Sequence, residues 1–135
     1  MKTSIKNKVL FVLALLFGLL FINAGLNKFL NYMPMPDNLP EKMQKAMAAF
    51  MEIGWVMPLV GCAEIAGGLL IIFPKTRALG ALIILPVMVG IVLTNSVQDT
   101  SGLPIALSLA AILTWILFEN ADKYRSLITT NKRNG

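Results

Sequence analysis

Glu64 lies in the middle of an apolar segment, residues 55–73, that contains no other charged side chain. Placing an acidic side chain at the centre of a membrane-spanning helix costs about 3 kcal/mol on insertion scales, so such a residue is retained where it has a partner or a use. A carboxyl group in this position can bind a polar headgroup, transfer a proton or join two helices through a hydrogen bond. Glu64 is therefore the first candidate functional residue, with a purely structural role as the alternative.

A second group of polar residues lies near the end of the first apolar segment. Asn23, Asn27 and Asn31 are spaced four residues apart, so a helix would carry them on one face. At about 1.5 Å of rise per residue, Asn23 comes near the depth of Glu64 in the next, antiparallel helix. Lys28 could contribute to the same site or extend its ammonium group to the membrane surface.

The two later apolar segments add polar residues in the same half of the expected bundle. Asn95 lies at the end of the third segment and Ser108 one turn into the fourth. This one-sided distribution predicts a polar, ligand-binding pocket that opens toward the outer leaflet and has Glu64 at its floor. The candidate ligand-binding residues are Glu64, Asn23, Asn27, Lys28, Asn95 and Ser108.

The residue types also limit the chemistry that the chain can perform. It has no histidine, and Cys62 is its single cysteine, so the usual ligands of haem, zinc and iron–sulfur clusters are missing. Cys62 is two residues from Glu64, which places it on a different helix face, where a packing role is expected. We therefore assign no catalytic residue and no metal ligand, and we expect no catalysis by the isolated protein. A diffusible quinone is the cofactor that would fit.

The composition is that of an integral membrane protein. Of the 135 residues, 56% are hydrophobic and 14% are charged, and the mean hydropathy is +0.71. Soluble proteins have about 25% charged residues. Four segments approach the roughly 20 residues needed to cross the hydrocarbon core, namely 9–30, 55–73, 78–97 and 103–118. We expect one domain that covers residues 1–135.

The basic residues predict the orientation of these spans. With the N-terminus inside, nine Lys and Arg residues are cytoplasmic and three are outside, which follows the positive-inside rule. We therefore expect a multi-pass protein of the bacterial inner membrane with both termini cytoplasmic. The net charge of +5 is explained by this topology and by anionic lipid, and no nucleic-acid partner is indicated. The nine residues are Lys2, Lys6, Lys8, Lys75, Arg77, Lys123, Arg125, Lys132 and Arg133.

Residues 31–54 form the one long connection, and they contain a helical pattern of their own. Leu39, Met43, Met47 and Phe50 recur at helical spacing among polar residues, which predicts a short amphipathic helix in the outer interface. Such a helix could be a simple connector or a lid over a site below it. The other connections are short, so the expected fold class is all-α, an up-down four-helix membrane bundle with this interfacial helix between the first two spans.

These features resemble the DoxX-like family of small four-helix integral membrane proteins. The resemblance is carried by residues 19–25 and 27–29, by the Ala63-Glu64-Ile65-Ala66-Gly67-Gly68-Leu69-Leu70 segment, and by the basic turn at residues 74–78 that leads to Gly80. It covers the first three spans. The resemblance singles out Lys28 and Glu64 without assigning their roles.

The resemblance implies an accessory role in a membrane redox system. Some members pair with a thiosulfate:quinone oxidoreductase, others belong to thiol or oxidative-stress complexes, and membrane chaperones of receptor assembly are distantly similar. The first hypothesis is an accessory subunit that binds a quinone or lipid ligand beside a redox partner. The alternative is a non-catalytic scaffold or assembly chaperone that holds a partner protein or a second copy through small-residue helix faces.

Overall fold

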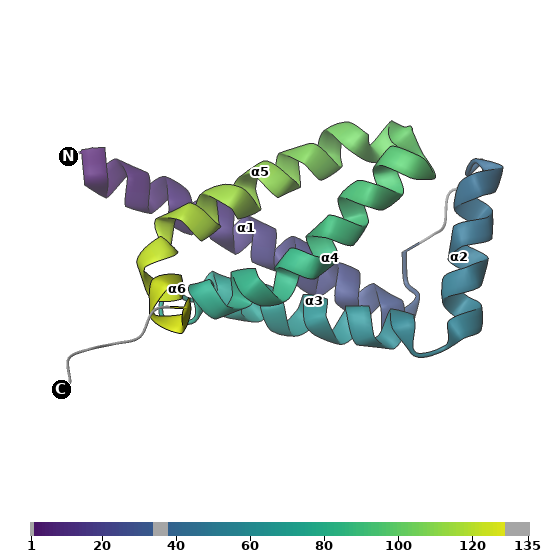
Figure 1. Cartoon of the computed structure of the whole chain (residues 1–135), viewed down its shortest axis with the longest axis horizontal. Coiled ribbons are helices and arrows are strands. Elements are labelled where there is room, and N and C mark those ends of the chain that lie inside the picture. The colour runs from purple at the N-terminus through teal and green to yellow at the C-terminus, as the bar shows by residue number, and fades with distance from the viewer. Residues whose placement is uncertain (1, 34–37, 129–135) are drawn as a thin grey trace.

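The computed structural model describes residues 2–33 and 38–128, and within this part of the chain every regular element is a helix (Figure 1). It confirms the expected all-α membrane bundle. Lys132 and Arg133 lie outside the described residues. The elements are α1 (Lys2–Leu30), α2 (Glu41–Ile53), α3 (Val56–Ile72), α4 (Arg77–Val97), the 3-10 turn η1 (Thr100–Gly102), α5 (Leu103–Glu119) and α6 (Ala121–Ile128).

Within residues 2–33 and 38–128, three helical segments are long and apolar enough to cross a membrane: Ser4–Leu30, Arg77–Val97 and Thr100–Glu119. The shorter α3 joins α2 through a bend of 93°, and this pair makes a fourth span if it is counted as one broken unit. Gly54 forms the bend with a φ of +87°, a left-handed conformation that glycine adopts without a steric cost. Because of the bend, α2 lies across the end of the bundle instead of extending α3 (Figure 1).

Glycine residues let α1 and α4 approach α3 at backbone distance. A Cβ atom added to Gly68 would lie 2.7 Å from the carbonyl oxygen of Gly18, and one added to Gly25 would lie 2.6 Å from that of Gly61. On the other side of α3, a Cβ on Gly80 would lie 2.7 Å from the carbonyl oxygen of Gly67. Close approach through small residues is typical of helices packed in lipid. The small-residue faces are therefore used within the chain itself.

The buried core lies between α1, α3, α4 and α5. In α1, the rings of Phe17 and Phe21 are 4.7 Å apart and both side chains are almost completely buried. Leu113 and Ile116 are the buried residues through which α5 joins this core. The chain order α1, α3, α4, α5 is also the order of packing, as expected for an up-down bundle with short connections.

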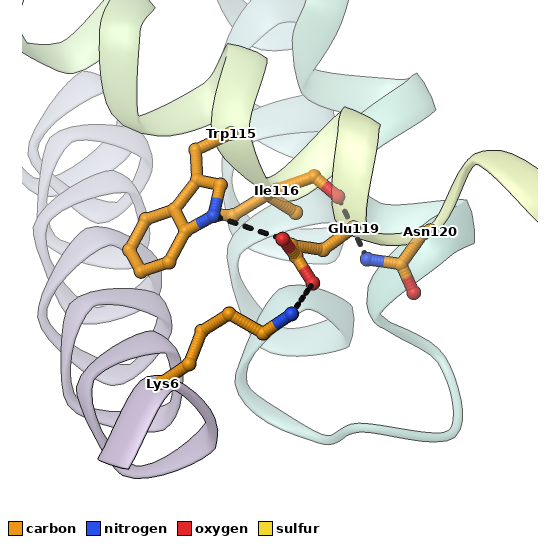
Figure 2. Close-up of polar contacts among 5 residues, drawn as sticks. All are labelled: Lys6, Trp115, Ile116, Glu119 and Asn120. Atoms are coloured by element: carbon orange, nitrogen blue, oxygen red, sulfur yellow. Dashed lines mark hydrogen bonds and ion pairs between the residues drawn. The ribbon is translucent and has the colours of Figure 1, made fainter. Parts of the chain in front are cut away.

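Polar contacts hold together the end of the bundle opposite α2, where α1 begins and α5 ends (Figure 2). The Lys6 ammonium lies 3.3 Å from one carboxylate oxygen of Glu119, and the Trp115 indole N–H donates to the other at 3.1 Å. The side-chain amide of Asn120 donates to the carbonyl oxygen of Ile116 at 2.8 Å and caps α5. These contacts tie the first turns of α1 to the last turn of α5.

Arg77 closes the short turn between α3 and α4. Its side chain is buried, and it donates to the carbonyl oxygens of Ile71 at 2.8 Å and Ile72 at 3.1 Å, which satisfies two acceptors at the end of α3. The helix α6, which the sequence did not predict, packs beside this turn through a hydrogen bond from the Tyr124 hydroxyl to the Ala78 carbonyl oxygen. Burial raises the pKa of Tyr124, which keeps its phenol in the donating form.

Candidate functional site

A pocket of about 410 Å³ lies at the α2 end of the bundle, between α1, α2, α3 and α4. Its lining residues are Lys28, Met43, Met47, Phe50, Val56, Met57, Val60, Glu64, Pro86, Val87, Gly90, Ile91, Thr94 and Asn95.

Glu64 forms the floor of this pocket. Its side chain is 3% exposed, and it is the only one of the lining residues that is buried. In α3 it follows Val60 by four residues and Met57 by seven, so these three side chains share the helix face that lines the pocket. Glu64 therefore faces the interior of the bundle.

Lys28 is the partner of Glu64. The ammonium Nζ of Lys28 lies 2.7 Å from Glu64 Oε1, and the lysine side chain is 19% exposed. Lys28 comes from the last turn of α1 and reaches across α3 at Gly61, where an added Cβ would lie 3.3 Å from Lys28 Cβ. The missing side chain at Gly61 thus makes room for the lysine stem. A buried ion pair therefore sits at the bottom of the pocket.

The ion pair leaves most of the acceptor capacity of Glu64 unused. Although Oε1 is within 2.7 Å of the ammonium, this atom has no partner in hydrogen-bond geometry. No other donor to Glu64 is found in residues 2–33 and 38–128. A carboxylate can accept about four hydrogen bonds. The floor can therefore accept a hydrogen bond from a group that enters the pocket.

The walls of the pocket are apolar, which differs from the polar pocket that the sequence predicts. Met43, Met47 and Phe50 of α2 line it, so the apolar face predicted for this helix covers the site. On α4, Pro86 and Gly90 provide part of the wall, and a Cβ on Gly90 would have no atom within 4 Å. The charged groups thus lie at the floor of a largely apolar chamber, and Thr94 and Asn95 add polar atoms on α4.

Asn23 and Asn27 have a different role from the predicted one, and neither lines the pocket. The chain turns back after α1 at Asn31, which has a left-handed φ of 53°. After this turn, the Tyr32 hydroxyl donates to the carbonyl oxygen of Asn23 at 2.9 Å, and the Met33 backbone N–H donates to Asn27 Oδ1 at 2.8 Å. These asparagines therefore hold the segment that leaves α1, and Asn31 does not continue their helical row.

The remaining two candidates are divided between the pocket and the surface. Asn95 lines the pocket, but its amide nitrogen donates to the Ile91 carbonyl oxygen of its own helix at 2.8 Å. Ser108 is exposed on α5, where its hydroxyl donates to the Pro104 carbonyl oxygen at 2.8 Å, and it does not line the pocket. The structure thus brings together Glu64, Lys28 and Asn95 from the predicted set.

The lining residues without polar side chains were missed in the sequence because nothing in them suggests a site. Pro86 and Gly90 lie four residues apart on α4 and both line the pocket. Their spacing on one helix face was the available signal, although nothing in it identified which face met Glu64.

Among the described residues that line the pocket, Lys28 and Glu64 are the only ionisable ones, and their charges balance. In the described part of the chain, no group of three or more His, Cys, Asp or Glu side chains could hold a metal ion. The thiol of Cys62 is exposed, away from the buried face of α3 that carries Glu64. Such a pocket can bind an amphipathic molecule whose polar end contacts the ion pair.

Comparison with known proteins gives a match to the family described as DoxX over residues 9–96, more than half of the chain. The matched segment runs from α1 to the end of α4 and includes every residue that lines the pocket. No curated protein matches the chain significantly, and neither does any solved structure.

Proposed function

Because the chain belongs to the DoxX family of membrane proteins, we propose that it is an accessory subunit of a membrane redox system that binds a quinone or lipid ligand in this pocket. The observation that carries the proposal is the Lys28–Glu64 pair at the floor of a largely apolar chamber of about 410 Å³. Pockets for small ligands combine such apolar walls with a few polar groups that fix the orientation of the ligand.

A purely structural role explains this ion pair less well. Two apolar side chains of similar volume are often as stabilising as a buried ion pair, or more so. Here the pair also faces a cavity, where it has fewer packing contacts than within a filled core. The headgroup of a ligand would contact Lys28 and Glu64, and its apolar tail would leave along the methionine-rich walls. A partner protein would supply the redox chemistry, and the isolated chain would not be a catalyst.

The alternative is a scaffold or assembly chaperone that holds a partner through small-residue helix faces. One observation weighs against this use of the small-residue faces. The glycines of α3 already contact α1 and α4 inside this chain. A partner protein or a second copy would therefore have to bind another surface.

We propose that the protein lies in a bacterial inner membrane with both termini cytoplasmic and α2 outside. The start of α1 and α6 lie together at one end of the bundle, and α2 lies at the other (Figure 1). Within the described residues, Lys6, Lys8, Lys75 and Lys123 belong to the first end, which supports the cytoplasmic assignment by the positive-inside rule.

Cysteine labelling in whole cells tests this orientation. In a Cys62→Ala background, a cysteine at Lys45 of α2 is expected to react with a membrane-impermeant maleimide added outside. A cysteine at Lys75, in the α3–α4 turn, should react only after the cells are permeabilised. Both positions are exposed, so accessibility of the side chain within the fold does not bias the result. The reverse pattern would refute the proposed topology.

Ligand binding can be tested by filling the pocket at Gly90. Because a Cβ there meets no atom within 4 Å, Gly90→Leu should fold normally while its side chain occupies the chamber. A photoreactive decylquinone should label the wild-type protein at lining residues, and this labelling should fall at least tenfold in the variant.

The matched control is Val89→Leu. Val89 is the neighbouring residue on α4, is 51% exposed and does not line the pocket. This variant places the same leucine side chain on α4 outside the pocket, so labelling should remain at the wild-type level. If Gly90→Leu and Val89→Leu give the same labelling as the wild type, the quinone binds elsewhere and this pocket is not its site.

A further inference from the structure

We infer that the pocket binds a neutral phenolic headgroup that donates a hydrogen bond to Glu64, so that a hydroquinone binds more tightly than the corresponding quinone. This inference rests on the proposed ligand-binding function and specifies which redox form of the ligand the site prefers. It concerns binding alone, and no electron transfer by this chain is involved.

The charge balance of the pocket argues for a neutral headgroup. Lys28 and Glu64 are the only ionisable residues among its described lining, and they already neutralise each other at 2.7 Å. A charged headgroup would bring one uncompensated charge into an apolar chamber, where the loss of hydration is costly. A phosphate or an ammonium headgroup is thus disfavoured, and a neutral polar group is favoured.

The geometry of Glu64 argues for a hydrogen-bond donor. Within the described residues the carboxylate contacts the Lys28 ammonium, 2.7 Å from Oε1, and no other donor. A hydroxyl group can donate to this carboxylate, and hydrogen bonds to an ionised acceptor are stronger than those between neutral groups. A quinone carbonyl can only accept, so it could use Lys28 but would leave Glu64 without a donor.

The walls argue for a flat ring instead of a branched headgroup. The thioethers of Met43, Met47 and Met57 and the ring of Phe50 surround the chamber above the ion pair. Methionine sulfur makes favourable contacts with aromatic rings, and its flexible side chain adapts to a planar ligand. Diacylglycerol also offers a neutral hydroxyl, but its headgroup has no ring for these side chains to contact. We therefore assign the headgroup to a phenol.

The test compares ligands that share one decyl tail and differ only in the head: a hydroquinone, its quinone and its dimethyl ether. The full chain is reconstituted in phosphatidylcholine nanodiscs, and dissociation constants are measured without oxygen. The hydroquinone is expected to bind about tenfold more tightly than either of the other two, a ratio equivalent to about 1.4 kcal/mol. The dimethyl ether is the sharpest comparison because it retains the ring and cannot donate.

Two variants locate the preference. Glu64→Gln keeps the shape of the side chain and removes its charge, so the hydroquinone preference should fall to less than about threefold. Gly90→Leu should abolish binding of all three ligands, since it fills the chamber. The ranking of ligands by the wild-type protein does not depend on either variant and remains decisive if one of them folds poorly.

The outcomes separate this inference from the proposed function. Absence of binding by every ligand would refute the proposed function itself. Equal binding of the hydroquinone, quinone and dimethyl ether would leave the ligand-binding function intact and refute the donor preference. Dioctanoylglycerol provides the last comparison, because tighter binding of this lipid than of the hydroquinone would show that a hydroxyl is recognised without a ring, which contradicts the phenolic assignment.

Discussion

Replacing Gly68 by valine is expected to destabilise the folded bundle by about 3 kcal/mol, at the upper end of the usual range for overpacking. A Cβ atom at this position would lie 2.7 Å from the carbonyl oxygen of Gly18 and 3.1 Å from Cγ1 of Ile22. Because the first of these is a backbone atom, α1 itself would have to move away from α3. Equilibrium unfolding in detergent, followed by helical circular dichroism, would measure the loss.

Gly90→Val is the matched control for this substitution. Both positions are helical glycines in expected spans, but no atom lies within 4 Å of a Cβ placed on Gly90. The free energy of unfolding should stay within about 0.5 kcal/mol of the wild-type value, as for substitutions away from tightly packed sites. If both variants lose the same stability, valine in the helix is responsible, and the contact between α1 and α3 is not.

Glu64→Leu is expected to give the second large effect, a loss of about 3 kcal/mol in the free energy of unfolding. Removing one member of a buried ion pair leaves the other charge uncompensated. Here the remaining Lys28 ammonium would lie in an apolar pocket with only part of its side chain exposed. The measurement is again detergent unfolding, with the wild type and the Lys28→Met single variant in parallel.

The double variant Glu64→Leu/Lys28→Met separates stability from function. It replaces both charges with apolar side chains, which should restore stability to within about 1 kcal/mol of the wild type. Ligand binding should not return, since neither a donor nor an acceptor remains at the floor of the pocket. Recovery of binding together with stability would mean that the ion pair only supports the fold.

The spans could be predicted from the sequence because lipid requires long apolar helices, and this constraint acts locally. The helices α3, α4 and α5 lie within two residues of the expected segments, whereas α1 starts earlier, at Lys2 instead of Val9. The helix α6 was missed because the segment 121–128 is short and mostly polar. Its position depends on the hydrogen bond between Tyr124 and Ala78. Contacts between distant residues of this kind leave no periodic signal.

The candidate site could be predicted only at its centre. Glu64 was identifiable because a charge in an apolar helix is conspicuous in any sequence. The choice of Lys28 over Asn23 as its partner depends on the left-handed turn at Asn31, after which Tyr32 engages Asn23. Depth along the helix placed Asn23 and Glu64 at the same level, but it did not give the direction in which each side chain points.

The glycine contacts described above also divide the bundle mechanically. The helices α1, α3 and α4 approach one another closely enough for their backbones to touch. In contrast, 17% of the most apolar part of Thr100–Glu119 is buried, compared with 33% of that of Ser4–Leu30. Changes in bilayer thickness or lateral pressure would therefore be taken up mainly by sliding of α5. The floor of the pocket, built from α1 and α3, belongs to the stiff part, so its shape should persist while the surrounding lipid varies.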